Sequence, residues 1–123
     1  MAKLEKKAVR AAFNEACLTR DGHRCVICGA TNIKLDVHHI TPRDQMPRGG
    51  YIAENGVTLC AAGKDSCHTR AEMALKETEP DPIYGPSALY DKIGSSHERA
   101  MQADFVVLQE FWIELLKSRK SSV

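Results

Sequence analysis

The chain has 123 residues, of which 43% are hydrophobic and 27% charged; this is the composition of one globular domain and excludes a disordered tail. No apolar run approaches the roughly 20 residues that span a bilayer. The basic start lacks the apolar segment of a signal peptide, so we expect a cytoplasmic protein with no membrane partner. Residues 1–70 carry eleven Lys or Arg against seven Asp or Glu (+4), whereas residues 71–123 carry six against nine (−3). The asymmetry permits a nucleic-acid partner for the first half, although on charge alone a mildly positive solvated surface is the favoured interpretation.

Spacing of apolar residues predicts a helix, two short strands and a second helix in the first part of the chain. Residues 3–19 carry an apolar stripe with a period of 3.6 residues, which is typical of a helix. Two β-prone runs follow at 35–40 and 57–60, separated by a loop rich in Pro, Arg and Gly. The segment 67–76 is predicted as a helix that ends before an acidic, proline-rich connection.

Two further helices are predicted after this connection. A short one follows Ser87, and a long one begins at Ser95, because the sequence SSHE places Ser95 at the N-cap and Glu98 three residues later. Large apolar residues of the long helix recur at alternating spacings of four and three, which makes a packing seam. We favour a helix that covers the core, with a dimer through this helix as the alternative. The seam consists of Met101, Phe105, Leu108, Trp112 and Leu115.

The cysteines indicate a metal site. Cys25 and Cys28 form a CVIC pair followed by glycine, and Cys60 and Cys67 form a second, more widely spaced pair. Four thiolates from two such pairs predict the closed tetrahedral site of a structural zinc. A redox-active CxxC would need a βαβ context, and a disulfide framework would need export, so both are disfavoured. Cys17 lies in the first apolar stripe and is expected to be a small buried hydrophobe.

Two adjacent histidines stand in the run DVHHITPR at 36–43. Either histidine alone would usually be a satisfied core residue. On a strand, however, neighbouring side chains point to opposite faces, so one buried ion cannot easily bind both His38 and His39. The pair therefore predicts two different roles.

The HH pair after an acidic residue, Asn55 inside ENGVTLC and His68 directly after the last cysteine resemble, in that order, the motif of HNH endonucleases. The CVIC and CH elements resemble the zinc-bearing branch of that family. The resemblance extends from Arg20 to about Glu72, and it implies a ββα-metal fold, in which two short antiparallel strands and a helix surround one catalytic divalent ion.

The expected fold class is therefore α+β. It consists of a small zinc-stapled ββα-metal core over residues 20–76, a flanking N-terminal helix, and a C-terminal helical extension over residues 86–119. We expect residues 1–123 to form a single domain.

The resemblance implies roles position by position. His39 matches the general base, and Asn55 matches the central Asn, which orders the loop that carries the base. His38 and His68 match ligands of the catalytic ion. Glu72 lies four residues after His68, on the same face of the predicted helix, where colicin-type relatives carry a further histidine ligand. A solvated helix carboxylate is an equally good interpretation of Glu72.

Two charged residues near the histidines are further candidates. Asp36 is interpreted as a partner of a metal ligand, against the alternative of a plain charge at a strand edge. Arg43 is a candidate phosphate contact, although isolated basic residues in loops are more often simply solvated.

The function implied is that of a metal-dependent DNA endonuclease, which nicks or cuts double-stranded DNA and leaves 5′-phosphate and 3′-hydroxyl ends. In-line hydrolysis needs a base and a metal ion on opposite sides of the phosphate, and two neighbouring side chains that point apart can supply both. The implied cofactors are one structural Zn²⁺ and one catalytic ion, namely Mg²⁺, Mn²⁺, Ni²⁺ or Zn²⁺. DNA is expected to bind mainly through its phosphate backbone. Phage packaging, restriction and mobile elements all use such domains.

The alternative function is a noncatalytic zinc-knuckle module that binds nucleic acid or a protein. That hypothesis explains the four cysteines, but it leaves the HH pair, Asn55 and His68 without a role.

Overall fold

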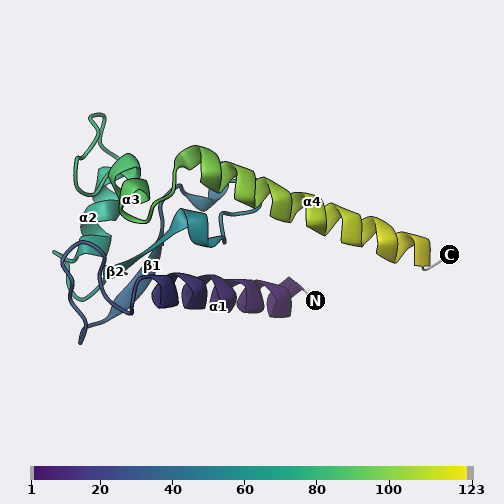
Figure 1. Cartoon of the computed structure of the whole chain (residues 1–123), viewed down its shortest axis with the longest axis horizontal. Coiled ribbons are helices and arrows are strands. Elements are labelled where there is room, and N and C mark those ends of the chain that lie inside the picture. Colours follow the sequence, from purple (N-terminus) through teal and green to yellow (C-terminus); the bar gives the residue numbers. More distant parts are fainter. Residues whose placement is uncertain (1, 122–123) are drawn as a thin grey trace.

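The computed structural model describes residues 2–121, with side chains described for residues 6–118. The order of elements is the predicted one, and every boundary lies within two residues of the expected position (Figure 1). Helices and strands fit the expected α+β class. The elements are α1 (Ala2–Arg20), β1 (Leu35–His39), β2 (Gly56–Cys60), α2 (Cys67–Ala74), α3 (Pro86–Lys92) and α4 (His97–Ser121), with 3₁₀ turns at Arg43–Gln45 and Ala53–Asn55.

The two strands form an antiparallel sheet in which Leu35 pairs with Cys60 and His39 pairs with Gly56. All five residues of β2 are buried, since α1 and α2 both pack against this strand. Gly56 allows the close approach of α1: a Cβ there would lie 2.5 Å from the Sγ of Cys17 and 2.7 Å from the ring of Phe13. Cys17 itself is fully buried, as expected.

The end of α1 is fastened to β2 by a charged pair. Arg20 donates to the carbonyls of Ala53, at 2.7 Å, and Gly56, at 2.6 Å, while Asp21 accepts the backbone N–H of Thr58 at 3.0 Å. Burial tends to raise the pKa of Asp21, but the hydrogen bonds from Arg20 and Thr58 outweigh it and hold the pKa below its usual value. The pair therefore fixes the helix against the strand that supports the candidate site.

Serine caps start both α2 and α4. At α2, Ser66 accepts the backbone N–H of Thr69 at 3.2 Å, which puts Cys67 and His68 in the first helical turn. The predicted cap at Ser95 is wrong by one residue. The hydroxyl of Ser96 accepts the N–H of Arg99 at 3.0 Å, whereas Ser95 donates to the carbonyl of Glu54 at 2.9 Å.

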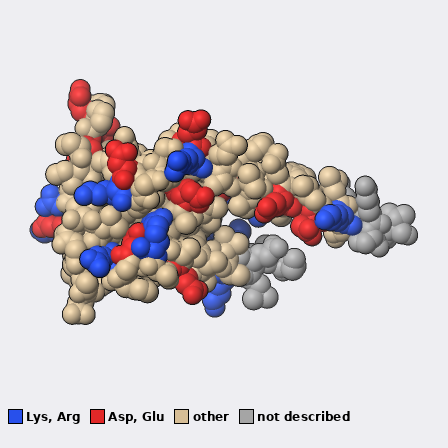
Figure 2. All heavy atoms as spheres, in the orientation of Figure 1, with Lys and Arg blue, Asp and Glu red and all other residues tan. Residues whose placement is uncertain are grey.

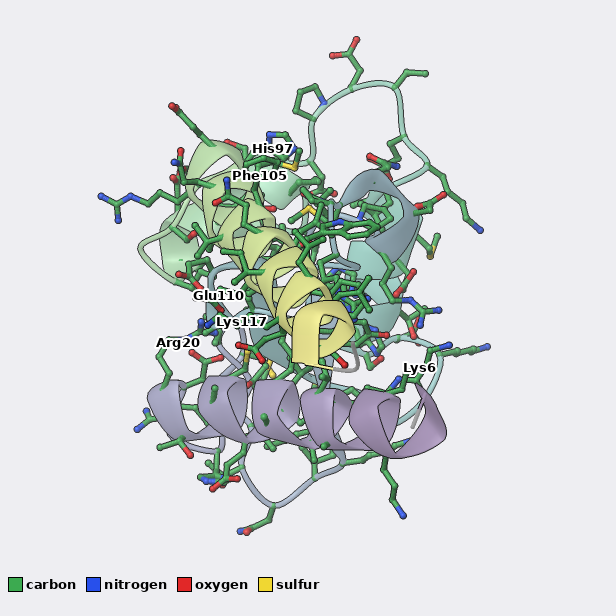
Figure 3. All side chains as sticks on the ribbon, turned by 90° about the vertical axis from the view of Figure 1, so that its right-hand side faces the viewer. Lys6, Arg20, His97, Phe105, Glu110 and Lys117 are labelled. Carbon is green, nitrogen blue, oxygen red and sulfur yellow. The ribbon has the colours of Figure 1, made fainter. Side chains whose placement is uncertain are left out.

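Beyond Asp104, α4 leaves large apolar side chains exposed and does not cover the core, contrary to the favoured prediction. Ala100 and Asp104 are buried, but Phe105 is 50% exposed and Trp112 is 52% exposed. Figures 1 and 2 show α4 projecting beyond the rest of the molecule as a narrow arm. Seen along the helix in Figure 3, Phe105 lies on the side of α4 that is turned away from α1. Within residues 2–121, none of the helices is both long and apolar enough to cross a membrane.

Candidate functional site

The four predicted zinc ligands come together at one end of the sheet. The Sγ atoms of Cys25, Cys28, Cys60 and Cys67 all lie within 4.8 Å of one another. Cys28 and Cys60 are 3.8 Å apart, and a tetrahedral ion with Zn–S bonds of about 2.3 Å requires an S···S distance of about 3.8 Å. The cluster therefore has the dimensions of a zinc site.

Backbone amides already point at two of these sulfurs. The N–H of Cys28 donates to the Sγ of Cys25 at 3.5 Å, and the N–H of Cys67 donates to the Sγ of Cys60 at 3.3 Å. Burial tends to raise the pKa of Cys25, but the amide hydrogen bonds outweigh it and lower the pKa to about 7. Burial and the neighbouring thiols raise the pKa of Cys67 to about 12. Four thiolates are therefore stable together only with a cation among them.

The wide spacing of the second pair is accommodated by a turn and a helix start. Gly63 adopts a φ of +88°, in the left-handed region that suits glycine, and Ser66 then caps α2. The turn reverses the direction of the chain, so the start of α2 places Cys67 next to the other three thiols. Cys17 is not part of the cluster, and burial raises its pKa to about 11, which keeps it a neutral thiol.

A second group of possible metal ligands consists of His38, His68 and Glu72. Their ligand atoms lie within 4.8 Å of one another. The Oε1 of Glu72 is 3.4 Å from the Nδ1 of His38 and 3.3 Å from the Nε2 of His68. β1 supplies the first ligand, and one turn of α2 supplies the other two, so the predicted three-residue set is brought together.

His38 is in the state that metal binding requires. Both ring nitrogens are buried, and among the described residues neither has a well-formed hydrogen bond; the nearest charged group to Nδ1 is the Oε1 of Glu72, at 3.4 Å. Burial lowers the pKa of His38 to about 4, against the opposing effect of Glu72. The ring is thus a neutral imidazole with an unsatisfied nitrogen, which a divalent ion can satisfy.

Asp36 lies beside His68, one of the residues predicted to bind the catalytic ion. Its Oδ2 is 3.5 Å from the Nδ1 of His68, on the opposite side of the ring from the Nε2 that faces Glu72. A carboxylate in this place fixes the orientation of an imidazole ligand and increases its basicity.

His39 lies apart from this ligand group, in an aromatic slot. Its ring centroid is 4.7 Å from that of Phe13, on α1, and 4.7 Å from that of Tyr51, which meets it edge-on. Nε2 is buried and has no hydrogen-bond partner among the described residues. Packing of the two aromatic rings therefore holds the imidazole on this side.

A guanidinium group also faces the slot. Arg43 donates to the hydroxyl of Tyr51 at 2.8 Å. Burial, and to a lesser extent the charge of Arg43, lowers the pKa of His39 to about 4. His39 is therefore neutral near pH 7 and able to accept a proton, beside a cation that can attract a phosphate.

Asn55 is fully buried and holds the two residues that follow His39. Its side chain accepts the N–H of Thr41 at 2.9 Å and donates to the carbonyl of Thr41 at 3.0 Å. The backbone carbonyl of Asn55 accepts the N–H of Ile40 at 2.9 Å. Asn55 thus fastens the start of the loop after β1 to the start of β2.

Four residues near the candidate site were missed by sequence reasoning. Phe13 and Tyr51 form the slot, while Tyr90 and Asp104 contact Asn55 and the 48–50 turn. Each has an ordinary place in an apolar stripe, a loop or a helix, so no spacing rule marks it.

Comparison with known proteins supports the resemblance. Residues 25–72 match the family model described as HNH endonuclease, so the predicted resemblance is confirmed over this segment of the chain. The match contains both ligand groups, His39 and Asn55, and it ends before α3 and α4. No curated protein and no solved structure matches the chain.

Proposed function

We propose that this chain is a metal-dependent DNA endonuclease in which His39 is the general base. The observation that carries the proposal is that the two adjacent histidines lie in different surroundings. His38 belongs to a group of three possible metal ligands, while His39 occupies a separate aromatic slot on the opposite face of β1. A base and a metal site that flank one phosphate are what phosphodiester hydrolysis requires.

In the proposed reaction, His39 takes a proton from the attacking water. Since Nε2 is buried, we assign this task to Nδ1. Asn55 holds the backbone after His39 and so fixes the ring, and Arg43 binds a phosphate oxygen. Water that attacks opposite the 3′ oxygen leaves 5′-phosphate and 3′-hydroxyl ends.

The proposed ligands of the catalytic ion are His38, His68 and Glu72, with Asp36 orienting His68. When bound, a divalent ion stabilises the negative charge that develops on the phosphate and the leaving oxygen. Two imidazoles and one carboxylate suit Mn²⁺, Ni²⁺ or Zn²⁺, and Mg²⁺ where it is abundant. The four cysteines would hold a structural zinc, and we propose a cytoplasmic location, because cysteine zinc ligands need a reducing compartment. We also propose that residues 1–123 fold as one domain.

Cleavage of supercoiled plasmid tests the proposal. Purified protein with Mg²⁺, Mn²⁺, Ni²⁺ or Zn²⁺ should nick or linearise the plasmid, EDTA should stop cleavage, and His39→Ala should be inactive under the same conditions. The matched control is His23→Asn, which removes an exposed imidazole and places a tolerant residue at a φ of 51°. No cleavage with any ion would favour the noncatalytic zinc-knuckle module.

We further propose that the exposed face of α4 pairs with a second copy of the chain. Phe105, Trp112 and the neighbouring Leu116, which is 53% exposed, lie at the spacing of a coiled-coil seam. The neutral Gln102 and Gln109 flank this seam, so like charges do not oppose self-association. These three half-exposed side chains offer roughly 300 Å² per copy, which suits at most a weak, concentration-dependent dimer.

Light scattering during gel filtration tests the dimer. The wild-type protein should change from monomer to dimer as its concentration rises, and Trp112→Ala should remain monomeric. Lys117→Ala, at a charged position of the same helix, is the control and should behave as wild type. A wild-type protein that stays monomeric at all concentrations would exclude this interface.

A further inference from the structure

Two buried polar side chains connect the C-terminal helices to the candidate active site. Tyr90, on α3, is 3% exposed, and Asp104, on α4, is 1% exposed. Both lie outside the HNH segment 25–72. Burying a hydroxyl or a carboxylate is costly unless hydrogen bonds compensate, so their partners indicate what these residues do.

Tyr90 completes the hydrogen bonds of Asn55. Its hydroxyl donates to the Oδ1 of Asn55 at 2.7 Å and lies 2.6 Å from the Oγ1 of Thr41. The same Oδ1 accepts the N–H of Thr41. The amide of Asn55 is therefore held from both sides, and it cannot rotate without leaving a buried polar group unpaired.

Asp104 fixes the turn that precedes Tyr51. Its Oδ2 accepts the backbone N–H of Arg48 at 2.6 Å and of Gly50 at 3.1 Å. Gly50 has a φ of +72°, and a Cβ on it would lie 2.5 Å from the Nδ2 of Asn55. Among the described side chains, Asp104 forms no ion pair, so these two amide donors are what stabilise its buried charge.

The two sets of hydrogen bonds meet at His39. Asn55 holds Ile40 and Thr41, which directly follow His39, and Gly50 directly precedes Tyr51, whose ring packs edge-on against His39. The Nδ2 of Asn55 also donates to the carbonyl of Gly50 at 3.3 Å, which joins the two sets. The backbone and the ring of His39 are thus each fixed by a residue of the C-terminal helices.

We propose that Tyr90 and Asp104 are positioning residues, through which α3 and α4 hold His39 in its reactive orientation. The proposal rests on the function proposed for His39. It assigns the C-terminal extension a part in catalysis that the HNH segment does not supply. Their hydrogen bonds go to Asn55, Thr41, Arg48 and Gly50 and not to His38, His68 or Glu72, so binding of the catalytic ion should not depend on them.

Three variants and one control test this role. Asp104→Ala removes the acceptor of two amides, and Tyr90→Phe removes one hydroxyl. Asp104→Asn keeps an oxygen in place, and since both amides donate to a single oxygen, this variant should rescue the function. The control is Asp81→Ala: Asp81 accepts the N–H of Ile83 at 2.9 Å and of Tyr84 at 2.8 Å, in a loop outside the network.

Plasmid cleavage should separate the variants by kcat. We expect Tyr90→Phe and Asp104→Ala to lower kcat about 10-fold or more, the usual scale for loss of a residue that orients a catalytic group. KM for DNA and the affinity for Mn²⁺ should stay within about twofold of the wild-type values, because phosphate contacts and metal ligands are unchanged. Asp104→Asn and Asp81→Ala should cleave at the wild-type rate.

NMR of the same proteins, zinc-loaded and without DNA, measures positioning independently of activity. Tyr90→Phe and Asp104→Ala should shift the ring resonances of His39, and Asp104→Ala should speed hydrogen exchange at the Arg48 and Gly50 amides. If the wild-type protein cuts no DNA, the function proposed for His39 fails, yet these resonances still report whether its ring is held. Unchanged resonances in both variants, or an equal loss of kcat in Asp81→Ala, would overturn the proposal.

Discussion

The two groups of possible metal ligands lie in one small core, yet they differ in the number and the exposure of their residues. The cysteine cluster offers four ligands, three of them buried, whereas the histidine group offers three, and the side chain of Glu72 is 57% exposed. Four protein ligands fill the coordination sphere of zinc, while three leave a position open for water or substrate. The comparison teaches that the cysteine cluster is suited to structural stabilisation and the histidine group to chemistry.

The largest effect that sharpens this comparison is loss of the cysteine cluster. Cys25→Ser or Cys67→Ser should abolish zinc binding and unfold the protein, since a four-thiolate zinc site contributes on the order of 10 kcal/mol or more to folding. Elemental analysis and thermal denaturation measure both effects. Cys17→Ser is the control and should keep one zinc per chain. A Cys25→Ser protein that retains both its zinc and its melting temperature would refute the structural role.

The second effect is on catalysis without loss of the fold. His39→Ala should lower the cleavage rate about 10²- to 10⁴-fold, the range expected for loss of a general base. Circular dichroism and zinc content should match those of the wild-type protein. Single-turnover cleavage at saturating Mn²⁺ measures the rate. A loss smaller than about 10-fold would assign the base to another group.

The third effect concerns the histidine group, in which three ligands leave a coordination position open. Glu72→Gln should weaken binding of the catalytic ion about 10-fold, and high Mn²⁺ should restore most of the cleavage, because water can replace an exposed carboxylate ligand at a cost in affinity. Titration of the rate with Mn²⁺ measures this. Glu77→Gln, an exposed carboxylate beyond the end of α2, is the matched control. Cleavage by Glu72→Gln with the wild-type Mn²⁺ dependence would remove Glu72 from the ligand set.

The smallest effect is on DNA affinity. Arg43→Gln should weaken binding modestly for all sequences and reduce the slope of log K against log salt concentration by about 1, as expected for loss of one phosphate contact. Fluorescence anisotropy over a range of salt concentrations measures this slope. An unchanged slope would mean that Arg43 serves only to hold Tyr51.

The sequence predicted the parts of the site in which chemistry dictates residue type and spacing. The structure brings together the residues that these patterns predicted to be neighbours. They are the four cysteines, and His38 with His68 and Glu72. The slot around His39 was not predictable, because Phe13 reaches it only through the packing of α1 against the sheet.

The C-terminal helices show the same limit. Heptad spacing revealed the apolar face of α4, but a periodic pattern does not say which surface covers that face. The burial of Asp104 also depends on where α4 crosses the 48–50 turn, which local sequence does not encode.

The division of roles between His38 and His39 is the central claim, and calorimetric titration of Mn²⁺ tests it most directly. Wild type, His38→Ala and His39→Ala are compared, each with one zinc per chain confirmed beforehand. His38→Ala should lose about 10-fold or more in Mn²⁺ affinity, whereas His39→Ala should bind within about twofold of wild type. Equal loss in the two variants would show that both imidazoles bind the ion, and it would contradict the account.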